Sequence, residues 1–131
     1  MNTRYPDHYE NLRKLSGKLA RELRSSMSAF AQLRGAASAE GALSTKFKQL
    51  IALGIGIAVR CDGCIAYHLH DAIRAGATRQ EIMETIGVAI LMGGGPAMVY
   101  GCETLEALDQ FTATGVVPTE SSRTAAREGQ P

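Results

Sequence analysis

The chain has 131 residues and a mass of 14.0 kDa, which is the size of one compact domain with one modest core. Its formal charge of +1 lacks the positive excess typical of proteins that bind a nucleic-acid backbone. The hydrophobic fraction of 45% excludes a wholly disordered chain, and 3 cysteines do not make the multi-bridge framework of a small secreted domain.

The first ten residues carry several charged side chains and no apolar stretch, so they do not resemble a secretory signal. The longest unbroken apolar run, Leu50 to Val59, is much shorter than the roughly 20 residues that a helix needs to cross a bilayer. We therefore expect a cytoplasmic protein in a reducing compartment, with neither a nucleic acid nor a membrane as its partner.

We predict two N-terminal helices in residues 1–41, and we expect both to pack on the core. The first carries a stripe at helical spacing, formed by Leu12, Leu15, Leu19 and Leu23. The second is shorter and ends before a small, flexible segment from Gly35 to Gly41.

We predict four further helices in residues 42–112, and we expect these helices to form the core. Ser44 can cap the first of them, which we expect to be buried, and the segment from Cys61 to Ala75 forms the second. Thr78 and Glu81 make a capping box at the start of the third, and a fourth helix follows the triple glycine.

No stretch alternates long enough to predict a strand, so we expect a single all-α domain of about six helices. Residues 113–131 lack a sustained apolar period and are predicted to form a flexible tail, above all from Pro118 to Pro131. Aromatic residues make up only 5% of the chain, so its core should be small. We hypothesise that other copies of the chain complete this core by homo-oligomerisation.

The segment from Cys61 to His68 carries the chemistry. Two cysteines in C-x-x-C spacing at a helix start lie within disulfide reach, and His68 lies one turn beyond Cys64. The helix N-terminus favours a thiolate, and His68 could accept the proton of Cys64. Such a thiolate could attack a peroxide to give a sulfenic acid, which Cys61 would convert into a disulfide with release of water.

The sequence favours neither a zinc site nor a thioredoxin-like fold for this segment. A zinc site would need a second pair of ligands, and the remaining candidates Cys102, His8 and His70 are scattered, with His70 on a different face of the helix from His68. A thioredoxin-like fold would need a βαβ pattern, which is absent. Cys102 is predicted to be a small buried residue rather than a third redox partner.

These motifs occur together with Leu43-Ser44-Thr45-Lys46, Gly76-Ala77-Thr78 and Met92-Gly93-Gly94-Gly95-Pro96-Ala97. The combination resembles the carboxymuconolactone decarboxylase superfamily, in its AhpD-like alkylhydroperoxidase branch, over about half the chain. The resemblance implies an all-helical fold, homo-oligomers such as trimers or hexamers, and peroxide reduction without a metal or flavin cofactor. An external thiol or dithiol reductant protein would restore the thiols.

The resemblance also assigns roles to individual residues. Cys64 would be the peroxidatic thiol, Cys61 the resolving and partner-facing thiol, and His68 part of a proton relay. Family members with the full relay have a glutamate where this chain has Gln49. An amide cannot exchange a proton or carry a charge, so peroxidase activity is expected to be weakened. Asp71 could supply a nearby carboxylate instead, or be an exposed helix charge.

Three functions remain open at this point. The first is a thiol-dependent peroxidase acting on hydrogen peroxide or small organic hydroperoxides. The second is a decarboxylase of a lactone acid, which the superfamily name suggests. The third is a non-catalytic, oligomeric redox sensor, a function that the glutamine at position 49 makes more plausible.

Overall fold

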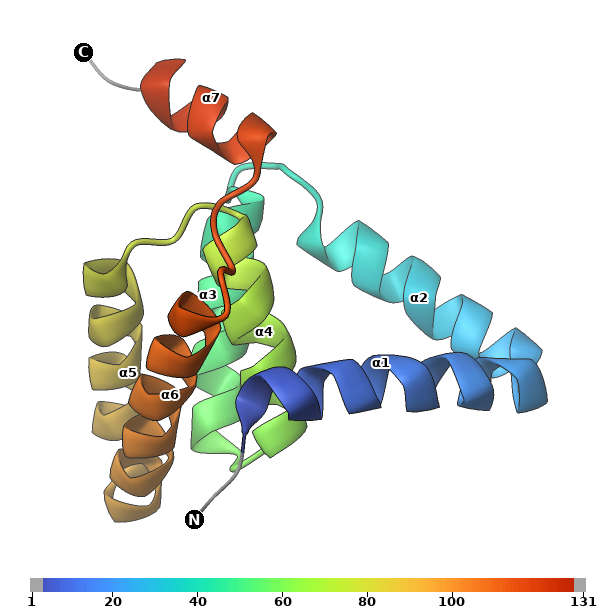
Figure 1. The fold of residues 1–131 in the computed structure, drawn as a ribbon, viewed down its shortest axis with the longest axis horizontal. Helices are drawn as coiled ribbons and strands as arrows, with labels where there is room; N and C mark the ends of the chain where they lie inside the picture. The colour runs from blue at the N-terminus through green and yellow to red at the C-terminus, as the bar shows by residue number, and fades with distance from the viewer. Residues whose placement is uncertain (1–3, 129–131) are drawn as a thin grey trace.

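The computed structural model describes residues 4–128, and within that range the chain forms helices and no strands (Figure 1). The helices are α1 (Tyr5–Glu22), α2 (Arg24–Ser38), α3 (Thr45–Ala58), α4 (Asp62–Arg74), α5 (Arg79–Gly93), α6 (Gly95–Ala113) and α7 (Glu120–Glu128). The prediction of an all-α fold is confirmed. None of these helices combines the length and the apolar composition that crossing a bilayer would require.

Helices α3 to α6 form the body of the molecule, and α3 contacts the other three (Figure 1). Their inward faces supply the large side chains of the core, which include Leu53, Ile57, Ile65, Leu69, Ile82 and Phe111. Burial of each such side chain contributes roughly 1.5–3 kcal/mol. The body is therefore a helical bundle held together by one continuous apolar core.

The predicted helix boundaries in the body are confirmed by their caps. The hydroxyl of Ser44 accepts a hydrogen bond from the amide of Phe47 at 3.1 Å. Thr78 and Glu81 form the reciprocal capping box, with bonds of 3.1 and 2.8 Å. Gly76 follows α4 with φ of +98°, a left-handed conformation that favours glycine.

The two N-terminal helices are only partly packed on this body. Tyr5, at the start of α1, is 1% exposed, and Tyr9 packs against the core one turn later. The rest of α1 and all of α2 lead away from the body and return to it, which leaves an open triangle in Figure 1. We call residues 15–38 the arm. No residue of α2 is buried, whereas α1 contacts both α4 and α6.

Two other boundaries differ from the sequence prediction. Helix α2 continues through Gly35 to Ser38, so the predicted flexible segment is shorter than expected. The prediction of a flexible tail is wrong for Glu120–Glu128, which form α7. Polar bonds hold this segment in place: the amide of Thr119 donates to the carbonyl of Arg74 at 2.9 Å. Residues 129–131 lie outside the described part of the chain.

Helices α3 and α4 approach each other most closely at Gly56. A Cβ atom added at Gly56 would lie 3.0 Å from the Cβ of Cys64 and 3.6 Å from its carbonyl carbon. Gly56 also accepts, through its carbonyl oxygen, a hydrogen bond of 2.9 Å from the amide of Cys61. The glycine therefore sets the position of the first turn of α4.

We predict that Gly56→Ala destabilises the protein by about 1–3 kcal/mol, because the added methyl group must push the two helices apart. The matched control is Gly87→Ala in α5, where nothing lies within 4 Å of an added Cβ. That control should gain about 0.5–1 kcal/mol, the usual advantage of alanine over glycine in a helix. Urea denaturation of both variants measures the difference; equal effects would contradict the tight approach.

Candidate functional site

The C-x-x-C pair lies at the N-terminal end of α4 and is joined by a disulfide. Cys61 is the N-cap of the helix, and the amide of Cys64 donates to its sulfur at 3.1 Å. The two Cα atoms are 5.1 Å apart. The predicted disulfide reach is therefore confirmed, and both sulfurs lie where the unpaired amides of a helix start favour negative charge.

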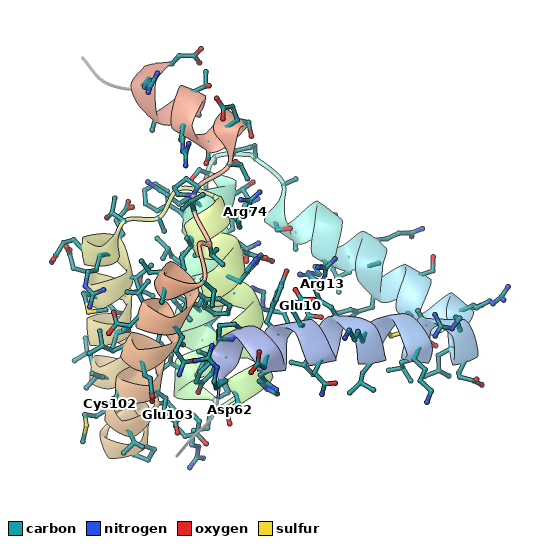
Figure 2. The ribbon with its side chains drawn as sticks, viewed as in Figure 1. Glu10, Arg13, Asp62, Arg74, Cys102 and Glu103 are labelled. Atoms are coloured by element: carbon teal, nitrogen blue, oxygen red, sulfur yellow. A yellow bond between two sulfur atoms is a disulfide. The ribbon has the colours of Figure 1, made fainter. Side chains whose placement is uncertain are left out.

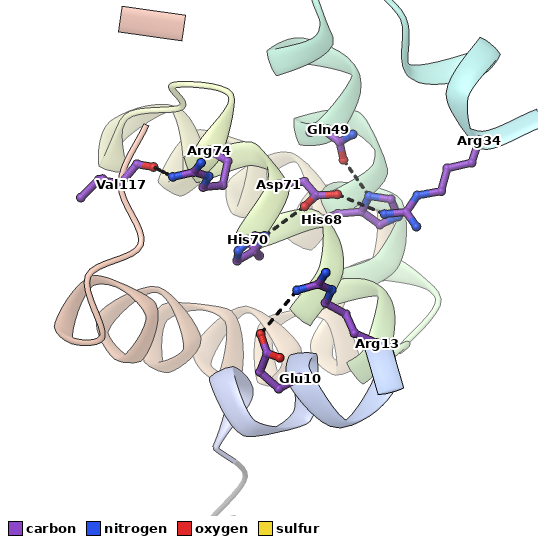
Figure 3. Close-up of polar contacts among 9 residues, drawn as sticks. All are labelled: Glu10, Arg13, Arg34, Gln49, His68, His70, Asp71, Arg74 and Val117. Carbon is purple, nitrogen blue, oxygen red and sulfur yellow. Dashed lines mark hydrogen bonds and ion pairs between the residues drawn. The ribbon is translucent and has the colours of Figure 1, made fainter. Parts of the chain in front are cut away.

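His68 lies one turn after Cys64 and is held by a residue of α3. Its Nδ1 is 2.8 Å from Oε1 of Gln49, a contact drawn in Figure 3. Because an amide oxygen only accepts, Nδ1 carries the ring hydrogen in this pair and Nε2 is free to accept a proton. The structure thus brings together His68 and Gln49, two of the four residues singled out from the sequence.

The pKa of His68 lies below its usual value. Burial is the main cause, since it disfavours the charged ring, and the nearby charge of Arg34 lowers the pKa further, whereas Asp71 acts in the opposite direction. His68 is therefore neutral at pH 7. A neutral imidazole is a proton acceptor rather than an additional positive charge beside Cys64.

The disulfide faces a hollow between the body and the arm. The hollow has a volume of about 1130 Å³, and Cys61, Cys64, His68 and Gln49 all line it. Its opposite wall comes from α1 and α2 and is largely apolar, with Leu12, Phe30 and Leu33 among the lining residues. All four predicted site residues therefore meet at one surface that a small molecule can reach.

Asp71 does not take the place of the missing carboxylate at His68. Its Oδ1 is 3.0 Å from Nδ1 of His70, and its Oδ2 accepts a hydrogen bond from Arg34 at 3.2 Å (Figure 3). Burial would raise the pKa of Asp71, but the hydrogen bond with His70 and the positive charges around it hold the pKa below its usual value. Asp71 is thus a partly buried anion that anchors Arg34.

The other cysteine and histidine of this region lie elsewhere. His70 stacks on Tyr9, with ring centroids 4.0 Å apart, and does not line the hollow. Cys102 is exposed on the outside of α6 (Figure 2), so the prediction that it is buried is wrong. The buried positions of α6 include Gly101 and Thr104, and Cys102 falls beside that stripe. No group of three His, Cys, Asp or Glu side chains within residues 4–128 is gathered closely enough to hold a metal ion.

Asp62 stands between the two cysteines but belongs to a separate polar cluster with Tyr5 and Glu103. Burial raises the pKa of the Tyr5 hydroxyl, and the negative charges of Asp62 and Glu103 raise it further. Burial likewise raises the pKa of Glu103, with Asp62 adding to the effect. The cluster joins the start of α1 to α4 and α6 and does not line the hollow.

Arg34 and Tyr67 are the site residues that the sequence did not reveal. The guanidinium carbon of Arg34 lies 5.1 Å from the centre of the Tyr67 ring, and both residues line the hollow. Arg34 occupies an unremarkable position on a polar-looking helix, and its approach to α4 depends on how the arm folds back. No motif in the sequence carries that information.

Comparisons with known proteins agree with this architecture. The model of the carboxymuconolactone decarboxylase family matches residues 24–107. The chain belongs to the carboxymuconolactone decarboxylase family. The family resemblance found in the sequence is therefore confirmed. A curated relative, an uncharacterized protein of Cupriavidus necator, is 32% identical over 113 residues, which cover 86% of this chain and 100% of the relative.

Two solved structures of family members are similar in fold. A carboxymuconolactone decarboxylase family protein of Legionella pneumophila has a TM-score of 0.79 and 37% identity, with 82% of this chain and 96% of that chain covered. A Thermotoga maritima family member with a suggested part in the antioxidative response has a TM-score of 0.74 and 29% identity, with coverage of 82% and 92%.

We predict that Gln49→Glu raises the pKa of His68, because a carboxylate at hydrogen-bond distance favours the charged ring. NMR titration of the imidazole measures the change, and Gln80→Glu on the exposed face of α5 is the matched control. An unchanged His68 pKa would remove Gln49 from the relay.

We also predict that the stability of the wild type and that of Gln49→Glu depend differently on pH. In the native wild type the pKa of His68 is lowered, so stability should fall as pH drops through the unfolded value of about 6.5, where only the unfolded chain takes up a proton readily. In Gln49→Glu this loss should shrink or reverse, which urea titrations at pH 5 and pH 8 would measure.

Proposed function

We propose that this family member is a thiol-dependent peroxidase that reduces hydrogen peroxide or small organic hydroperoxides. The observation that carries the proposal is the Cys61–Cys64 disulfide at the start of α4, which lines an accessible hollow with His68 one turn behind it. The suggested antioxidative part of the Thermotoga relative supports the same direction. In the catalytic cycle, Cys61 and Cys64 would alternate between a disulfide and two thiols.

The chemistry balances in three steps. The Cys64 thiol loses its proton to Nε2 of His68, and the thiolate attacks one oxygen of ROOH, which breaks the O–O bond and gives Cys64 sulfenic acid and ROH once the proton returns. The Cys61 thiol then displaces water from the sulfenic acid and forms the disulfide. An external thiol or dithiol reductant protein reduces the disulfide to two thiols and is itself oxidised.

Gln49 limits the rate of this cycle. It orients the ring of His68 through a bond of 2.8 Å but cannot stabilise the charged ring as a carboxylate would. Gln49→Glu should therefore accelerate the reaction with peroxide. The cycle also requires a compartment that supplies thiols, and we propose a cytoplasmic location for that reason.

We predict that peroxide removes two thiols per chain from the reduced protein and restores the Cys61–Cys64 disulfide. Cys64→Ser should not react at the site, whereas Cys61→Ser should stop at a sulfenic acid, because no resolving thiol is present. Stopped-flow mixing, thiol counting and mass spectrometry measure these outcomes. Cys102→Ser is the matched control and should behave as the wild type, since Cys102 lies outside the hollow.

Each failure of that experiment has a distinct meaning. No loss of thiols in the wild type would refute the peroxidase. A disulfide that forms without turnover in the presence of a dithiol reductant would indicate a redox sensor. Turnover of a lactone acid that survives Cys64→Ser would indicate the decarboxylase activity in the family name.

We also propose that several copies of this chain assemble. Half-exposed leucines follow α1 along the arm, and Phe30 and Leu33 on α2 are each 62% exposed. A helix of 15 residues without a buried residue is marginal in water, so α2 needs a partner surface. A second apolar groove, of about 880 Å³, runs between α3 and α5. A second copy carries the same faces, and the small net charge does not hold copies apart.

We predict that the wild type is an oligomer in light scattering coupled to size exclusion, and that Phe30→Glu lowers its mass because a charge would have to be buried in the contact. Lys18→Glu on α1 is a charge-changing control on an exposed polar position. A monomeric wild type at micromolar concentration would contradict the assembly.

A further inference from the structure

The arm carries an arginine into the hollow that the disulfide lines. Arg34, on the last turns of α2, donates from Nη2 to Oδ2 of Asp71 at 3.2 Å (Figure 3). Its guanidinium carbon also lies 5.1 Å from the centre of the Tyr67 ring. Both partners belong to α4, the helix that begins at the cysteines. The guanidinium is thus fixed from two sides, although Arg34 stands on a helix without a buried residue.

The ion pair between Arg34 and Asp71 contributes little to the stability of the folded protein, so stability alone does not explain why Arg34 is held against α4. The side chain of Arg34 is 49% exposed, and ion pairs in such surroundings contribute about 0–1 kcal/mol. Arginine has five N–H donors in a planar fork, and the hydrogen bond to Asp71 engages one of its nitrogens. Further donors remain to bind an anion inside the hollow.

The guanidinium charge acts on the residues that carry the chemistry. The charge of Arg34 lowers the pKa of His68, against a larger and opposite effect of its partner Asp71, and Arg34 lines the same hollow as Cys64. His68 and Cys64 are four residues apart on α4, which places their Cβ atoms about 5–6 Å from each other. An anion on the sulfur of Cys64 would therefore form within the field of Arg34.

We propose that Arg34 supplies the positive charge of the redox site. It stabilises the Cys64 thiolate of the reduced protein and the oxygen anion that leaves when the peroxide O–O bond breaks. This inference rests on the proposed function and adds a residue to it. In the balanced step, Cys64–S⁻ and ROOH give Cys64–SOH and RO⁻, and RO⁻ then takes the proton held by His68.

The other groups of the hollow do not provide this charge. Its titratable and charged lining residues are Arg24, Arg34, Cys61, Cys64, Tyr67, His68 and Asp71. His68 provides no fixed positive charge, since it is neutral until it takes the Cys64 proton, and Asp71 is an anion. Arg24 also lines the hollow but stands at the start of α2, ten residues or about 15 Å of helix away from Arg34. Tyr67 and Asp71 are positioning residues, because they hold Arg34 against α4.

The test uses reduced full-length protein with Cys61→Ser and Cys102→Ser, so that Cys64 is the sole thiol. The rate of alkylation by iodoacetamide between pH 5 and 10 gives the pKa of Cys64. We expect Arg34→Gln to raise this pKa and to lower the thiolate fraction at neutral pH by about three- to ten-fold. Arg34→Lys should restore most of the thiolate, because it keeps the charge.

Arg21→Gln is the matched control: it removes an exposed arginine of the arm that does not line the hollow. Far-ultraviolet circular dichroism and melting curves verify that each variant is folded. A Cys64 pKa that is the same in wild type, Arg34→Gln and Arg34→Lys would overturn the proposal. Equal shifts in Arg34→Gln and Arg34→Lys would also overturn it, since they would indicate a structural role of the guanidinium fork.

Peroxide kinetics of the same variants separate this inference from the proposed function. A shifted Cys64 pKa together with a loss of peroxide reactivity in Arg34→Gln would support both. A shifted pKa in a protein that does not consume peroxide would refute the peroxidase and leave the charge assignment intact, because alkylation requires no peroxide.

Discussion

The close approach of α3 and α4 is the constraint on which the site depends. At Gly56 the two helices are separated by so little space that a methyl group would meet Cys64. That contact fixes the first turn of α4, where both sulfurs lie. Two turns earlier on α3, Gln49 faces the same helix and reaches His68. One packed interface therefore positions the first turn of α4 and orients the ring of His68 one turn later.

The body of the molecule could be predicted from the sequence because its signals are local. The capping box at Thr78, the Ser44 cap and the C-x-x-C spacing each describe a few neighbouring residues, and the structure confirms all three. Cys102 could not be placed, because one step along a helix separates the buried face from the exposed one. Helix α7 depends on bonds between Thr119 and Arg74, which are far apart in the sequence.

The arm could not be predicted for a related reason. Its leucine stripe indicates a buried face, yet in the single chain Leu15, Leu19 and Leu23 remain about half exposed (50%, 48% and 50%). An apolar stripe at helical spacing indicates that the helix packs on another apolar surface. It does not indicate whether the same chain or another chain supplies that surface. The arm is also one wall of the hollow, but these three leucines do not line it. The apolar face that lacks a partner and the face toward the disulfide are therefore different parts of the arm.

The charge state of His68 depends on whether position 49 holds a glutamine or a glutamate. A carboxylate at position 49 would favour a charged His68, and the site would then hold a cation one turn from Cys64. With glutamine there, burial keeps the ring neutral and able to accept a proton. A neutral ring gains a positive charge only when it takes the Cys64 proton, so a permanent positive charge would have to come from another residue. Arg34 brings a guanidinium charge to the hollow from the arm, so His68 is left free to exchange protons.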